Sequence, residues 1–208
     1  MKPTTMNRFF ALAAAAVLAA GAQGALAQQG EQSASELATG VCAACHGPKG
    51  RSISSVFPNL AGQQASYIVL QLNAFRSHER ADPNARAYMW GMASQLSDAT
   101  IKGLADYYAA QKPAPGQVGD KTLMAEGEKI FNDGVEANGV PACASCHGKE
   151  AQGNGAFPRL GGQHADYLIA QLEGFQSGTR ANAPIMDNVA HSMTHEQIRA
   201  AAVYAASK

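Results

Sequence analysis

The sequence has little charge of either sign, and the charge it has is balanced. Charged residues make up 15% of the 208 residues, with 16 Lys and Arg against 16 Asp and Glu. No segment clusters basic residues as a nucleic-acid-binding surface does, and no cationic amphipathic helix indicates binding to a membrane surface. We therefore expect no nucleic-acid partner and at most peripheral contact with a membrane.

Long apolar runs are also scarce. The run at residues 9–20 is shorter than the roughly 20 residues of a membrane-spanning helix, which disfavours a retained anchor. Lys2 and Arg8 precede the run, and the small residues Ala25 and Ala27 follow it. This pattern predicts a signal peptide over residues 1–27, cleaved after Ala27, and export to the periplasm. Cleavage removes two basic residues, leaving 16 − 2 = 14 against 16 acidic ones, a formal net charge of −2.

Cysteine is rare, and its few occurrences are patterned. All four cysteines fall in two copies of one motif, Cys42-Ala-Ala-Cys45-His46-Gly47 and Cys143-Ala-Ser-Cys146-His147-Gly148. Two thiols at this spacing can each add to one vinyl group of a porphyrin, and the histidine that follows can bind the iron. The sequence therefore predicts two covalently bound haem c groups, with four cysteine thioethers and with His46 and His147 as axial ligands of iron.

Two other uses of these cysteines are weaker. A zinc site would pool both pairs into one four-thiolate centre, but it gives no reason for a histidine to follow each pair. Structural disulfides fit poorly, because each pair is too closely spaced to cross-link much of the chain.

The second half of the chain repeats the first. The segment Phe57-Pro-Asn-Leu-Ala-Gly-Gln63 returns as Phe157-Pro-Arg-Leu-Gly-Gly-Gln163, and the cysteine motifs lie 101 positions apart (143 − 42). Between the halves, residues 111–120 contain two prolines and two glycines, typical of an extended linker. We therefore predict two domains, residues 28–112 and 121–208, joined by a linker at 113–120.

Within each half the hydrophobic pattern is helical and no segment reads as a strand, so the predicted fold class is all-α. Residues 65–77 and their counterparts carry the clearest pattern. Thr194 followed by Gln197 has the spacing of a capping box, and Ser97 marks the matching helix start in the first half. Domains of this size have marginal cores, so we expect a covalent haem to supply much of the packing and the apoprotein to fold poorly.

A methionine is the expected second ligand of each iron. Aligning the last helices pairs Leu96 with Met193 and thereby Met89 with Met186, the two methionines that recur at one position. Met92 is a rival to Met89. We assign Met193 to the core, because its counterpart is leucine.

The remaining histidines and two prolines complete the candidate site. His78, His164, His191 and His195 have no counterpart in the other half, and we expect them at loop or cap positions. A bis-histidine second haem through His191 is a minor alternative. Pro58 and Pro158 follow their haem histidines by twelve and eleven residues. Each proline carbonyl can accept from the histidine Nδ1–H, which leaves Nε2 for iron.

By these motifs the chain resembles the dihaem cytochrome c4 family. The resemblance covers nearly all of the mature chain and rests on both CxxCHG motifs, both Phe-Pro-x-Leu-x-Gly-Gln segments, the Met-x-x-x-Ala stretches at Met89 and Met186, and the closing helices with Tyr107 and Tyr204. It implies two tandem class I cytochrome c domains, each with crossing first and last helices and with histidine and methionine on iron. It also implies facing haem domains and electron transfer in the periplasm, commonly towards terminal oxidases.

We therefore predict an electron carrier and not an enzyme, with no catalytic residues. Its expected partners are redox proteins, namely a respiratory donor complex and a terminal oxidase or reductase. Two alternatives stay open. One is the cytochrome subunit of a larger dehydrogenase, such as a sulfide-oxidising flavocytochrome. The other is a dihaem peroxidase or thiosulfate-oxidising enzyme, which would need an open iron and nearby acid–base residues. The oligomeric state and the redox potentials are not predicted.

Overall fold

The computed structural model describes residues 33–208, so the predicted signal peptide lies outside the described residues. The described part is helical and holds no strand, only two isolated bridges, Val135 with Val140 and Asn154 with Phe157. The all-α class is confirmed. Over the same residues, no helix has both the length and the apolar content to cross a membrane.

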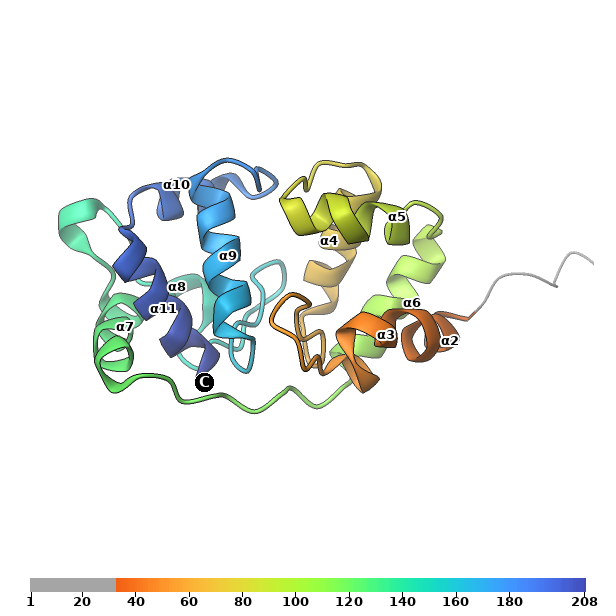
Figure 1. The fold of residues 1–208 in the computed structure, drawn as a ribbon, viewed down its shortest axis with the longest axis horizontal. Helices are drawn as coiled ribbons and strands as arrows, with labels where there is room; N and C mark the ends of the chain where they lie inside the picture. The colour runs from red at the N-terminus through yellow and green to blue at the C-terminus, as the bar shows by residue number, and fades with distance from the viewer. Residues whose placement is uncertain (1–32) are drawn as a thin grey trace, which may run out of the picture. The chain divides into compact units, whose positions relative to one another are not determined.

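The first half begins with a short helical segment and ends with a long helix (Figure 1). Its elements are α2 (Ala34–Leu37), a π-helical turn (Ala38–Cys42), α3 (Ala43–His46), a 3₁₀ turn (Pro48–Gly50), α4 (Ala65–Arg76), a second π-helical turn (Ala85–Met89), α5 (Trp90–Ala93) and α6 (Asp98–Ala109).

The second half repeats this order with a longer opening helix. Its elements are α7 (Lys121–Asp133), a 3₁₀ turn (Glu136–Asn138), α8 (Ala144–His147), α9 (Ala165–Gln176), α10 (Pro184–His191) and α11 (His195–Ala206). Between α7 and α8 the chain makes a tight excursion closed by backbone hydrogen bonds between Val135 and Val140. The first half has no such excursion, and there the opening helix runs directly into the cysteine motif.

Side-chain caps define where the helices begin. Thr194 accepts from the backbone N–H of Gln197, whose side chain accepts from the Thr194 N–H, so the predicted capping box is present. Ser97 caps α6 by accepting from the Thr100 N–H, as expected. Such caps satisfy N–H groups that have no partner within the helix.

The first and last helices of each half cross at a close approach. In the second half, a Cβ added to Gly127 of α7 would collide with the backbone carbonyl of Ala200 in α11. In the first half, a Cβ on Gly103 of α6 would collide with the Cβ of Ala34 in α2. Both crossings therefore need a residue without a side chain on one helix.

The core of each half is made mostly of small side chains. The largest fully buried residues are Phe131, Ile101 and Ile198, and many other buried positions are alanine. Little large apolar surface is thus removed from water by protein alone, which agrees with the expectation that a haem supplies part of the packing.

The predicted linker has neither helix nor strand. It contacts both halves: Arg51 donates to the Pro113 carbonyl at 3.3 Å, and the Gln117 N–H donates to the Ala206 carbonyl at 3.3 Å. The exact domain boundaries stay a prediction.

Candidate haem sites

Each cysteine motif occupies one helical turn that a glycine ends. Cys42, Cys45 and His46 lie on the helical stretch that stops at Gly47, where φ is 74°. Gly148 ends α8 in the same way with φ of 80°. Residues three apart share one face of a helix, so both thiols of a motif are presented to the same side. A side chain at Gly47 would collide with the Arg51 carbonyl, which explains why the turn needs glycine.

The two thiols of each motif differ in exposure in the same sense. Cys42 and Cys143 are half-buried, whereas Cys45 and Cys146 are exposed, and none is in a disulfide. Burial raises the pKa of the Cys143 thiol to about 11. Among the described residues no three of His, Cys, Asp and Glu gather as a metal site, so the pooled zinc alternative is wrong.

The two motif histidines are buried and oriented by the expected prolines. His46 is 8% exposed and its Nδ1 lies 3.0 Å from the Pro58 carbonyl oxygen. His147 is 6% exposed and its Nδ1 lies 2.9 Å from the Pro158 oxygen. Burial lowers the pKa of both histidines, and the proline carbonyls offset only part of this effect. Burial therefore favours the neutral form of both rings, and because a carbonyl oxygen can only accept, Nδ1–H is the donor.

This arrangement fits haem c. A neutral imidazole that donates from Nδ1 keeps its lone pair on Nε2, and no hydrogen bond within the described part of the chain involves Nε2 of His46 or His147. The donor set of each half is thus two thiols on one helix face and one free imidazole nitrogen beside them. Those are the groups that bind one haem covalently and one face of its iron.

Aromatic rings connect the first histidine to the methionine segment. The Phe57 ring lies 6.1 Å from the His46 ring and 5.3 Å from the ring of Tyr88, which directly precedes Met89. In the second half Phe157 lies 6.3 Å from His147, but the residue before Met186 is the aliphatic Ile185.

The methionines occupy different environments. Met89 ends the second π-helical turn, is half-buried, and packs against the cluster of Phe75, Ala85 and Ala93. Met92, one turn further, is 55% exposed. Met186 is half-buried in the first turn of α10.

Met193 is 5% exposed within the hydrophobic core of the second half, so its predicted core position is confirmed.

The other four histidines lie outside the two donor sets. His78 stacks on Trp90 with ring centroids 4.0 Å apart, and His195 lies 3.6 Å from Glu173 at the surface. His191 ends α10 and is exposed. His164 occupies the N-cap position of α9 without a capping bond from its side chain, and its Nε2 lies 3.1 Å from the Ser52 carbonyl of the other half.

The structure also brings together two arginines to which no role was assigned from sequence. Arg80 and Arg180 are each 4% exposed and lie over Phe75 and Phe175, respectively. Each crosses to the other half: Arg80 donates to Tyr167 at 3.1 Å, and Arg180 donates to Tyr67 at 3.0 Å.

Two glutamines join the same network. The side-chain oxygens of Gln71 and Gln171 each accept from both guanidinium groups. In the sequence, these arginines and glutamines each recur one hundred positions later. That recurrence could have pointed to the network, but it could not show that the bonded partners come from opposite halves.

Comparison with known proteins identifies the family. The cytochrome c family model matches residues 31–111 and again 124–206. Cytochrome c-552 of Acidithiobacillus ferridurans is 42% identical over 203 residues, covering 97% of this chain and 88% of that protein. The solved structure of cytochrome c4 from Acidithiobacillus ferrooxidans is 43% identical, with a TM-score of 0.76, covering 80% of this chain and 98% of that one.

A third relative is named for its role. The thiosulfate dehydrogenase electron acceptor of Thiomonas intermedia is 38% identical over 173 residues, covering 80% of this chain and 78% of that protein. With two matched domains and two fitting motifs, the chain belongs to the cytochrome c family as a dihaem member of the cytochrome c4 type, an electron carrier with two covalently bound haem c groups.

Proposed function

We propose that this cytochrome is exported to the periplasm, cleaved after Ala27, and passes single electrons from a respiratory donor complex to a terminal oxidase or reductase. The observation that carries the proposal is the pair of buried histidines held by the Pro58 and Pro158 carbonyls. In this proposal His46 and Met89 bind one iron, and His147 and Met186 bind the other.

Haem c supplies one-electron chemistry when bound, and the chain's residues decide how easily each electron is held. With a methionine thioether and a histidine imidazole as its protein ligands, each iron would have no position left for a substrate, which suits electron transfer, and the thioether would favour the ferrous state. The hydrogen bond from each histidine to a proline carbonyl fixes the ring orientation and strengthens the imidazole as a ligand.

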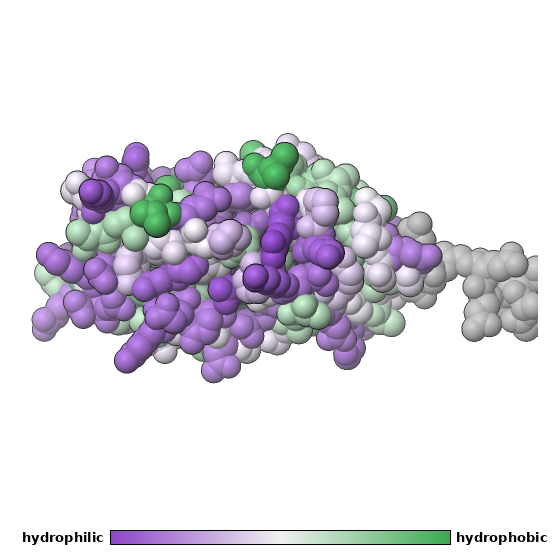
Figure 2. Space-filling view, turned by 90° about the horizontal axis from the view of Figure 1, so that it is seen from below, coloured by the Kyte–Doolittle hydropathy of each residue, from purple (hydrophilic) through white to green (hydrophobic). Residues whose placement is uncertain are grey.

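The surface supports brief encounters with protein partners. Figure 2 shows a face on which hydrophilic residues predominate and strongly hydrophobic ones form small, separate spots. Redox proteins that must dock and release quickly use small contact surfaces of this mixed kind. A respiratory complex is our first choice of partner, and the relative named as an electron acceptor of thiosulfate dehydrogenase makes such a dehydrogenase the second.

The test is the far-red absorption band that methionine sulfur gives on ferric haem, measured per haem in Met89→Ala, Met92→Ala and Met186→Ala. We expect Met89→Ala and Met186→Ala each to remove half of the band and open one iron to carbon monoxide, and Met92→Ala to leave the band intact. Loss of the band in Met92→Ala would reassign the first ligand. No band in the unmodified protein would refute methionine ligation.

A further inference from the structure

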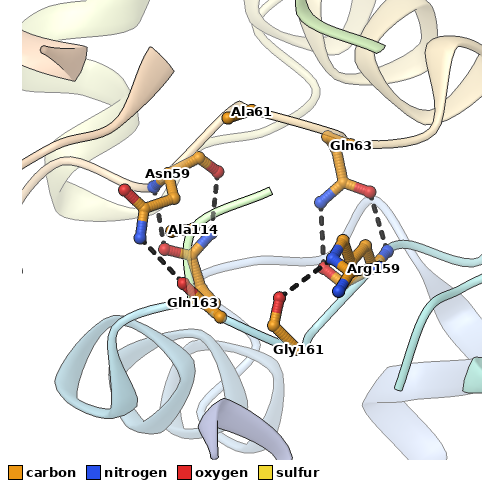
Figure 3. Close-up of a pocket in the computed structure, with 8 residues that line it drawn as sticks. Asn59, Ala61, Gln63, Ala114, Arg159, Gly161 and Gln163 are labelled. Carbon is orange, nitrogen blue, oxygen red and sulfur yellow. Dashed lines mark hydrogen bonds between the residues drawn. The ribbon is translucent and has the colours of Figure 1, made fainter. Parts of the chain in front are cut away.

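Two glutamines cross between the halves to the backbone that holds the haem histidines (Figure 3). The Gln163 side-chain oxygen accepts from the Asn59 N–H at 2.8 Å, and its amide donates to the Asn59 carbonyl at 2.9 Å. Gln63 makes the same pair with Arg159, at 2.7 and 2.9 Å. Both glutamines are buried, with 7% exposure for Gln63 and 6% for Gln163.

The amide reached by each glutamine is the one that orients a histidine. The Pro58 carbonyl and the Asn59 N–H belong to one peptide group, whose oxygen accepts from His46 and whose N–H donates to Gln163. A continuous chain of hydrogen bonds thus runs from the second half to the histidine of the first.

The mirror chain runs in the opposite direction. The Pro158 carbonyl accepts from His147, and the N–H of the same peptide group, on Arg159, donates to Gln63. Each half therefore contributes one glutamine to the histidine of the other half.

A peptide N–H that donates to a strong acceptor makes the carbonyl of that peptide a better acceptor, because hydrogen bonds in a chain polarise one another. A more polarised proline carbonyl draws the Nδ1 proton and enriches the imidazole in electron density. An electron-rich imidazole stabilises ferric iron and lowers the redox potential.

We propose that Gln163 is a positioning residue that lowers the potential of the first haem, and that Gln63 does the same for the second haem. Each half thus controls the redox potential of the other: substituting the glutamine of one half changes the potential of the haem held by the other half. The proposal rests on iron ligation by His46 and His147.

The experiment is a redox titration of the dihaem protein in which the two haems are spectrally distinct. Cys146→Ala leaves one vinyl group of the second haem unreacted, which shifts its absorption to longer wavelength. Cys45→Ala does the same for the first haem and replaces it if the first marker folds poorly. Both cysteines are exposed, so these are the gentler positions for the change.

In the marked protein, Gln163→Leu should raise the potential of the first haem, changing its ratio of ferrous to ferric iron at a fixed potential by about two- to tenfold. Gln163→Glu offers a stronger acceptor and should lower that potential. Gln63→Leu and Gln63→Glu should act on the second haem with the same signs.

Gln64→Leu is the matched control. The Gln64 side chain also crosses between the halves, but it donates to the Gln152 carbonyl at 2.9 Å and not to a proline peptide; the Gln64 backbone N–H, which donates to the Gln63 side-chain oxygen, is kept in this variant. It should leave both potentials unchanged.

Four results would overturn the inference: potentials that the glutamine substitutions leave unmoved, Leu and Glu variants that shift a potential in the same direction, a variant that shifts both haems alike, or a shift confined to the haem of the mutated half. The spectra of the same samples separate this from the proposed function. High-spin or carbon monoxide-binding iron in the unmutated protein would count against the axial ligands, whereas low-spin iron with unmoved potentials would count against the glutamines alone.

Discussion

The two halves make the same helix crossing but exchange the residues that make it. Ala34 and Gly103 meet in the first half, and Gly127 and Ala200 meet in the second, so the glycine has moved from the last helix to the first. What both halves keep is the absence of one side chain at the contact. The comparison teaches that the fold requires a short distance between the two helices, and that the glycine that allows it can lie on either helix.

The two buried arginines lie in equivalent positions of the two halves, but the charge of the group that accepts from their Nε differs. Arg80 Nε donates to the Asp82 carboxylate at 2.9 Å, whereas Arg180 Nε donates to the neutral Asn182 amide at 3.3 Å. Burial raises the pKa of Asp187 and Arg180 lowers it in part, but no ion pair joins these two within the described residues. Among the described residues, the first half therefore pairs its arginine Nε with a carboxylate, whereas the second half pairs its arginine Nε with a neutral amide.

The largest expected effect on stability comes from removing the acceptor of each arginine Nε in turn. Asp82→Ala leaves the buried Arg80 charge without its partner and should lower the free energy of unfolding by about 4 kcal/mol. Asn182→Ala removes one hydrogen bond between a cation and a neutral amide and should cost about 1–2 kcal/mol. Denaturant titration of both variants, followed at a haem band, checks this, and equal losses would show that the carboxylate charge is immaterial.

Gly127→Ala and Gly103→Ala sharpen the comparison of the crossings. The new methyl at position 127 meets a backbone carbonyl that cannot move away, so we expect about 2–3 kcal/mol of destabilisation. At position 103 it meets the Ala34 side chain in the first turn of a short helix, which can shift. A gain in helix propensity of about 1 kcal/mol then offsets much of the clash.

Trp90 is the only tryptophan of the chain and lies in the first half, so its fluorescence reports the Gly103 variant locally. The melting temperature of Gly127→Ala should be well below that of Gly103→Ala. The reverse order would mean that the α2–α6 contact is the more rigid one.

The smallest expected effect concerns the caps of the last helices. Thr194→Ala removes a capping box that involves the Gln197 side chain, and Ser97→Ala removes a hydroxyl that accepts from the Thr100 N–H and lies 2.8 Å from the Thr100 hydroxyl. Each should cost about 1 kcal/mol, with the larger loss at Thr194 because the Gln197 side chain loses its fixed position as well. Urea midpoints of the two variants provide the comparison, and a larger loss at Ser97 would contradict it.

The sequence by itself determined the haem chemistry and the duplication. Two thiols, an adjacent histidine and a terminating glycine act within a single helical turn, so their spacing along the chain is their spacing in space. The same locality made the Thr194 cap and the position of Met193 in the core predictable from sequence, because each depends on neighbours a few residues away or on one repeated pattern.

Only the tertiary structure decided how one half acts on the other. Gln63 recurs as Gln163 and Arg80 recurs as Arg180, each at a spacing of one hundred. Their partners, however, lie about a hundred residues away on the opposite half, as in the bond from Gln163 to Asn59. A repeat pattern is the same whether two halves pack against each other or stay apart. The crossed contacts arise from how the two surfaces fit, and that depends on packing between whole domains.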